Sequence, residues 1–149
     1  MAPSNLNRVT VLGAGVLGGQ IAWHSAFKGK TVVVYDPFPE AIAKAKVAHE
    51  MYARIYAAEL GASDADLEAT RSRVTYSDQL ERAVAKADLV IESVPEVPEI
   101  KTGVYQQMAA LLPPHTIVAT NSSTLLPGDF AAATGRPEQY CALHFANLI

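Results

Sequence analysis

The chain has 149 residues and a mass of 15.9 kDa; 50% of the residues are hydrophobic, 18% are charged, and the mean hydropathy is +0.12. This length and apolar content predict one domain with a sizeable core and exclude the disordered and fibrous classes. The net charge is −3 and no run of basic residues occurs, so nucleic acid is not expected as a partner. We also expect a soluble, cytoplasmic protein without a membrane partner, because no apolar run approaches the ~20 residues of a membrane helix and the first residues do not resemble a signal peptide.

The first part of the chain predicts a βαβ unit followed by a long helix. The β-branched run RVTVL (8–12) is typical of a strand, and it is followed by GAGVLG and by the helical pattern IAWHSAFK. Gly29 marks the end of that helix, and TVVVY (31–35) is a continuous apolar run of the kind buried on both faces of a parallel sheet. Residues 40–60 are rich in strong helix formers and are followed by Gly61, which predicts a second helix.

The rest of the chain continues the alternation of helices and strands. Ser63 predicts a helix cap, and a short strand over 74–76 precedes another helix that we expect Ser77 or Asp78 to cap. The remaining predicted elements are strands over 89–93, 116–121 and 141–145 and a helix over 98–111. The lone cysteine, Cys141, lies in the last apolar run, where we expect a buried thiol. The alternation predicts an α/β protein with a doubly wound, mostly parallel sheet in a three-layer αβα arrangement.

A glycine motif, G-x-G-x-x-G, connects the first predicted strand to the first helix. In this position its glycines provide a tight turn, room for a pyrophosphate and close packing of helix on strand, and the helix N-terminus attracts phosphate. We therefore expect a Rossmann-type dinucleotide-binding domain, although the glycines could serve only as a turn. The expected cofactor contacts in this turn are Gly13, Ala14, Gly15, Val16, Leu17 and Gly18.

An acidic residue, Asp36, ends the second predicted strand, 18 positions after Gly18. A carboxylate at this point accepts hydrogen bonds from the hydroxyls of an adenosine ribose. About 4 Å from a 2′-phosphate, it would meet a repulsion of ~4 kcal/mol per pair of unit charges at an effective dielectric constant near 20. Asp36 therefore predicts NAD rather than NADP as the cofactor. The alternative is an aspartate that caps the next helix.

Polar residues also follow the later predicted strands, and ligands of doubly wound sheets bind beyond the carboxyl ends of the strands. The glycine motif and these polar residues belong to four segments of the chain, which are in order GAGVLG, ADLVIESVPE, ATNSSTL and LHFAN. Together with the acid after the second strand, they resemble the 3-hydroxyacyl-CoA dehydrogenase family over almost the whole chain. The resemblance implies an NAD-dependent oxidoreductase of fatty acid β-oxidation that converts the 3-hydroxyl of a 3-hydroxyacyl-CoA to a 3-oxo group.

The resemblance also implies a role for each polar residue at this edge. His144 is implied as the general base or acid, Ser123 as a hydrogen-bond partner of the substrate's 3-oxygen close to the cofactor, and Asn147 as a contact to the nicotinamide and the reacting oxygen. Glu96 and Lys101 are implied near the ribose at the nicotinamide end of the cofactor. Independently, loss of a hydroxyl proton during hydride transfer needs a base that titrates near neutral pH, which is typical of histidine. Taken alone, a histidine in an apolar strand such as His144 is more often a hydrogen-bonded core residue, and Ser123 can serve as a turn or cap hydroxyl.

The chain ends at LHFANLI, directly after its last predicted strand, so we expect residues 1–149 to be one NAD(P)-binding domain cut from a longer enzyme. In the family, a glutamate shortly beyond the histidine orients the imidazole, and a C-terminal helical domain supplies most acyl-CoA contacts and the dimer interface. The resemblance thus implies a homodimeric intact enzyme and a 149-residue chain that binds NAD without turnover. Leu148 replaces the proline that usually follows H-F-x-N, which indicates a divergent branch.

Two other functions fit the same framework. One is the oxidation of a 3-hydroxyl without CoA, as in carnitine or gulonate dehydrogenases, and the other is a non-catalytic NAD-binding sensor or structural module. The presence of both Ser123 and His144 argues against the second, because cofactor binding alone needs neither. No metal site is expected, since the other histidines have no companion at metal-ligand spacing. These histidines are His24, His49 and His115.

Overall fold

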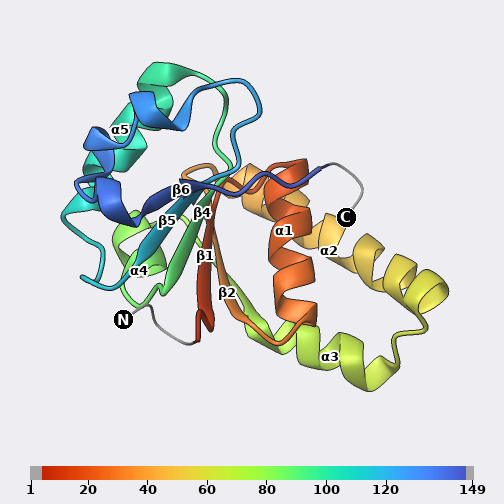
Figure 1. Ribbon diagram of the computed structural model, residues 1–149. Coiled ribbons are helices and arrows are strands. Elements are labelled where there is room, and N and C mark those ends of the chain that lie inside the picture. Colours follow the sequence, from red (N-terminus) through yellow and green to blue (C-terminus); the bar gives the residue numbers. More distant parts are fainter. Residues whose placement is uncertain (1–4, 147–149) are drawn as a thin grey trace.

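The computed structural model of the chain describes residues 5–146 and shows a six-stranded sheet in which all neighbouring strands are parallel. The strand order is β3-β2-β1-β4-β5-β6 (Figure 1). The strands are β1 (Arg8–Leu12), β2 (Thr31–Tyr35), β3 (Val74–Ser77), β4 (Leu89–Glu92), β5 (Ile117–Thr120) and β6 (Tyr140–Ala142). The order reverses between β1 and β4, which confirms the predicted doubly wound sheet.

Helices cover both faces of the sheet and complete the predicted three layers (Figure 1). One face carries α1 (Val16–Phe27), α2 (Pro39–Leu60) and α3 (Asp64–Arg73), and the other carries α4 (Leu80–Val84) and α5 (Pro98–Ala109). Between β5 and β6 the chain forms three short 3-10 turns, η1 (Pro127–Asp129), η2 (Ala132–Thr134) and η3 (Pro137–Gln139). None of the helices within residues 5–146 combines the length and the hydrophobicity that a bilayer span requires.

The sheet divides the main core into two apolar clusters. Successive side chains of a strand point to opposite faces, so Val11 belongs to one cluster and Leu12 to the other. Ile21 of α1 packs on the side of Val11, whereas Tyr105 and Met108 of α5 pack on the side of Leu12. Because both faces are covered, the carboxyl ends of the strands form the open edge at which a ligand can bind.

Two helix starts were predicted from capping residues, with different outcomes. Ser63 caps α3 as predicted, and its hydroxyl and backbone exchange hydrogen bonds with Asp66 in a capping box. The prediction for α4 was wrong, because Gln79 occupies the N-cap position instead of Ser77 or Asp78. Ser77 is the last residue of β3, and its hydroxyl accepts the N–H of Gln79 at 3.0 Å, so it supports the turn before the helix.

Two expectations at the C-terminal end were also wrong. The strand predicted over 141–145 ends at Ala142, which pairs with Thr120, the last residue of β5. The N–H of Leu143 still bonds to the carbonyl oxygen of Thr120, but Ala142 is the last residue in register with β5, so His144 follows the strand instead of lying in it. The thiol of Cys141 is exposed and not buried. β6 is the edge strand of the sheet, so its side chains are covered by a neighbouring strand on one side only.

Candidate cofactor and catalytic site

The glycine turn packs tightly against the loop after β4 and against the start of α1. Gly13 has a φ of +102°, and a Cβ at this position would collide with the carbonyl oxygen of Ser93. A Cβ on Gly18 would collide with the carbonyl oxygen of Gly13, so only glycine lets α1 lie this close to the turn. At Gly15, by contrast, a Cβ would meet no atom within 4 Å. The space beside Gly15 is therefore open, and the motif predicts a phosphate group there.

The N-terminus of α1 is open to an anionic group. Gly15 is its N-cap residue, no side chain caps its free N–H groups, and its first turn has no acidic residue. Free N–H groups and the positive end of the helix dipole attract phosphate. The side chain of Val16 is exposed, whereas that of Leu17 packs against a core cluster. Of these two predicted contacts, Val16 has the more accessible side chain, since that of Leu17 is partly buried.

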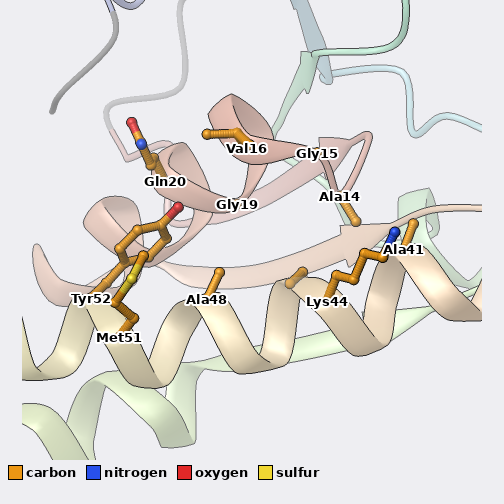
Figure 2. A pocket seen from close by; sticks show the side chains of 11 residues that line it. Ala14, Gly15, Val16, Gly19, Gln20, Ala41, Lys44, Ala48, Met51 and Tyr52 are labelled. Atoms are coloured by element: carbon orange, nitrogen blue, oxygen red, sulfur yellow. The ribbon is translucent and has the colours of Figure 1, made fainter.

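A groove of about 370 Å³ runs between α1 and α2 and reaches the glycine turn at Ala14 and Gly15 (Figure 2). Its walls are mainly apolar, and Lys44 of α2 is the charged residue among those that line it. An apolar groove at this position suits the uncharged part of a ligand.

Asp36 ties the glycine turn to the end of β2. Its buried carboxylate accepts the N–H of Ala14 at 2.9 Å with one oxygen and the N–H of Phe38 at 3.0 Å with the other. Phe38 is the N-cap residue of α2, so Asp36 also supports the start of the next helix, as the alternative interpretation expects. Each carboxylate oxygen has a further lone pair for a ribose hydroxyl. The two interpretations of Asp36 are thus compatible, and its contact with ribose stays a prediction.

Ser123 and His144 meet at the carboxyl edge of the sheet. Ser123 follows β5, His144 follows β6, and a hydrogen bond of 2.8 Å joins Ser123 Oγ to His144 Nε2. Both residues are exposed, so a substrate can approach this pair from solvent. The predicted meeting of the two side chains is confirmed, and their chemical roles stay a proposal.

Glu96, a predicted cofactor contact, holds the turn that carries Ser123. Its Oε2 atom accepts hydrogen bonds from Ser122 Oγ at 2.6 Å and from Thr124 Oγ1 at 2.9 Å, on either side of Ser123. Partial burial acts to raise the pKa of Glu96, but the bonds from Ser122 and Thr124 and the charge of Lys101 together lower it. Glu96 is therefore a carboxylate, and not a proton donor, at neutral pH.

Lys101, the other predicted contact in this region, is fully buried. Its Nζ atom lies 2.8 Å from Glu92 Oε1 and 3.4 Å from Glu96 Oε1. The side chain of Glu96 is 39% exposed. Of the two, only Glu96 reaches the surface, and Lys101 lies behind it.

Glu92 was not predicted from the sequence as part of this site, and Asn121 was expected there only as one of the polar residues that follow β5, without a role of its own. Glu92 is buried at the end of β4, where one oxygen accepts bonds from Lys101 Nζ, Tyr105 OH and Thr120 Oγ1. The available signal was an acid inside an apolar strand, since a buried carboxylate needs a charged or hydrogen-bonding partner. The Oδ1 atom of Asn121 accepts the N–H of Phe145 at 2.7 Å. Asn147, a predicted contact to the nicotinamide, lies outside the described residues.

A doubly wound sheet with a phosphate-binding glycine turn, an acid after β2 and a Ser–His pair at the same edge defines the class of dinucleotide-dependent dehydrogenases. Residues 8–149 match the family model of the 3-hydroxyacyl-CoA dehydrogenase, NAD binding domain. The chain belongs to this family, and NAD is its cofactor.

Curated relatives agree with this assignment. The chain is 36% identical over 144 residues to the probable 3-hydroxybutyryl-CoA dehydrogenase of Bacillus subtilis. The matched region covers 95% of this chain and 49% of that protein. The chain is 33% identical over 147 residues to the human mitochondrial hydroxyacyl-coenzyme A dehydrogenase. Here the matched region covers 95% of this chain and 47% of the human protein. The chain therefore spans about half the length of these relatives.

Solved structures show the same fold. A diketoreductase that acts on dicarbonyl compounds superposes with a TM-score of 0.94 and 46% identity, over 98% of this chain and 52% of that one. The 3-hydroxybutyryl-CoA dehydrogenase of Escherichia coli K12 superposes with a TM-score of 0.90 and 32% identity, over 96% of this chain and 30% of that one.

Proposed function

We propose that the intact protein is an NAD-dependent oxidoreductase that oxidises the 3-hydroxyl of a 3-hydroxyacyl-CoA to a 3-oxo group. The observation that carries this proposal is the 2.8 Å contact between Ser123 Oγ and His144 Nε2 at the carboxyl edge of an NAD-binding domain. Cofactor binding alone needs neither side chain. The contact therefore favours an enzyme over an NAD-binding sensor or structural module.

In this proposal His144 and Ser123 act on the same substrate oxygen. Bound NAD supplies a hydride acceptor for the carbon that carries the hydroxyl. His144 takes the hydroxyl proton as general base and returns it in the reverse direction, which typically contributes ~10²–10⁴-fold to the rate. The Ser123 hydroxyl forms a hydrogen bond to the 3-oxygen and keeps it beside the imidazole. The short distance between the two side chains allows one oxygen to contact both.

The cofactor contacts follow from the same edge of the sheet. We propose that the turn from Gly13 to Gly18 holds the pyrophosphate, because its N–H groups and the space beside Gly15 are open. The carboxylate of Asp36 accepts hydrogen bonds from the hydroxyls of the adenosine ribose, and its charge disfavours the binding of a 2′-phosphate. Glu96 is the accessible acceptor for the ribose at the nicotinamide end, and Lys101 supports it from behind. Asn147 completes this set in the proposal.

Two relatives point to different substrates. The Bacillus relative is named for 3-hydroxybutyryl-CoA, which supports a CoA thioester. The diketoreductase, 46% identical, acts on dicarbonyl compounds. The second candidate function is therefore the CoA-free oxidation of a 3-hydroxyl, as in carnitine- or gulonate-type dehydrogenases.

The relatives are about twice as long as this chain, so we propose that a second, helical domain in the intact protein supplies most substrate contacts and the interface of a homodimer. On its own, the 149-residue chain then binds NAD without turnover. We also propose a cytoplasmic location; within these 149 residues the single cysteine, Cys141, allows no internal disulfide of the kind that stabilises exported proteins.

The proposal is tested by following NADH absorbance with the full-length gene product and two substrates, acetoacetyl-CoA and a CoA-free 1,3-dicarbonyl compound. We expect a higher kcat/KM for the thioester. The reverse order would establish the second candidate. Tight NADH binding without reduction of either compound would contradict the proposed enzyme and favour the non-catalytic module.

A further inference from the structure

His144 lies in a segment just beyond the last strand of the sheet. β6 ends at Ala142, and residues 143–146 have no regular secondary structure. His144 is exposed, so packing of its own ring does not fix its position either. Something outside β6 must therefore set the direction in which the imidazole points.

Two hydrogen bonds connect this segment to the end of β5. The N–H of Leu143 donates to the carbonyl oxygen of Thr120 at 2.9 Å, and the N–H of Phe145 donates to Oδ1 of Asn121 at 2.7 Å. They lie on the two sides of His144. The first continues the ladder of the sheet, whereas the second depends on one side chain.

Asn121 is itself held firmly. Its N–H donates to the carbonyl oxygen of Glu92 at 2.9 Å, and only 6% of the residue is exposed. It stands two positions before Ser123 in the turn that Glu96 holds through Ser122 and Thr124. One residue thus contacts the segment of His144 and belongs to the turn of Ser123.

We propose that Asn121 is a positioning residue for His144. Its carboxamide oxygen fixes the N–H of Phe145 and thereby keeps His144 Nε2 within hydrogen-bonding distance of Ser123 Oγ. This inference rests on the proposed function, since it assigns the placement of the imidazole to a residue that does not touch the substrate. The misplacement of a reacting group by about 1 Å can cost ~10²-fold in rate, so loss of one such bond has a measurable effect.

The test uses variants of the full-length protein. Asn121→Leu has a similar size and no acceptor, and Asn121→Ser is smaller and its hydroxyl is too short to reach Phe145. Asn121→Asp keeps an acceptor oxygen at the same place. We expect Leu and Ser to lower kcat at least tenfold while the Kd for NADH stays within twofold, and Asp to recover most of kcat. Hydrogen exchange at the Phe145 amide should be faster in the Leu and Ser variants and restored in Asp.

Thr134→Val is the matched control. Thr134 is a buried residue whose hydroxyl accepts the N–H of Arg136 at 3.2 Å, a local bond of the same kind remote from residues 143–146. This variant should keep the wild-type kcat.

A kcat within twofold of wild type for both Asn121→Leu and Asn121→Ser would overturn the inference, as would an equal loss in Asn121→Asp and Asn121→Leu. If His144→Gln also keeps full activity, the proposed function itself fails; if only the Asn121 variants do, the proposed function stands.

Discussion

Ser123 Oγ and His144 Nε2 lie 2.8 Å apart, although 21 positions separate the two residues in the sequence. The contact exists because β5 and β6 are adjacent and parallel, so the segments that follow them leave the sheet at the same edge. The glycine turn follows β1 at the same edge, so the proposed sites of cofactor binding and of proton transfer lie on one side of the sheet.

Removal of the Lys101 amine should destabilise the fold strongly. Lys101→Met leaves the buried carboxylate of Glu92 without its cation, which typically costs about 3–5 kcal/mol. Urea unfolding of the 149-residue chain measures the change. The double variant Glu92→Gln, Lys101→Met removes both charges and should recover part of the loss. If the single variant is as stable as wild type, the ion pair does not hold the ends of β4 and α5 together.

The stability of the chain should fall as the pH drops below about 6.5, in part through His49. Burial lowers the pKa of His49, although the bond to the Gly19 carbonyl at 2.8 Å and the charge of Glu50 oppose this shift. The unfolded chain therefore binds a proton near pH 6.5 that the folded chain binds only at lower pH, so acidification favours unfolding, by at most about 1.4 kcal/mol per pH unit for one group.

Urea unfolding between pH 7.5 and 5 measures this dependence. His49→Gln should be less stable at pH 7.5 and should lose less stability on acidification than wild type. His24→Gln is the comparison, because burial and Lys28 lower the pKa of His24 as well, and His24 is less deeply buried. An unchanged pH slope in His49→Gln would contradict the assignment.

Gly15 and Gly18 should respond differently to substitution. Gly15 has an ordinary φ of −66° and free space around it, so Gly15→Val should fold normally and lose NADH binding, because the side chain fills the place of the pyrophosphate. Gly18→Ala should lower the melting temperature, since its methyl group meets the carbonyl oxygen of Gly13. Calorimetric titration and thermal unfolding distinguish the two effects. NADH binding that survives in Gly15→Val would exclude this turn as the phosphate site.

Asp36 should select NADH over NADPH. Repulsion of ~4 kcal/mol between the carboxylate and a 2′-phosphate corresponds to roughly a thousandfold in Kd. Asp36→Asn removes the charge while its side-chain oxygen can still accept the N–H of Ala14, so the preference should shrink in this variant. Titration of wild type and Asp36→Asn with both cofactors decides the point. Equal Kd values for the two cofactors in wild type would show that Asp36 is only a structural residue.

The parts of the site that the sequence predicted depend on local patterns. The glycine turn needs particular residues at fixed spacing after a strand, and the Ser–His pair follows from two strand ends of a parallel sheet. Glu92 was missed because its partners Lys101, Tyr105 and Thr120 lie on two other elements, and no local pattern joins them. The end of β6 was misplaced because CALHF is apolar apart from His144, whereas the strand ends where its partner β5 ends, at Thr120.

The most direct test of the proposed dehydrogenase is the kcat of His144→Gln in the full-length protein, with acetoacetyl-CoA as substrate and NADH saturating. The amide keeps a polar group near Ser123 but cannot accept or release a proton near neutral pH. We expect a fall in kcat of about 10²–10⁴-fold with an unchanged Kd for NADH. A kcat equal to that of wild type would contradict it.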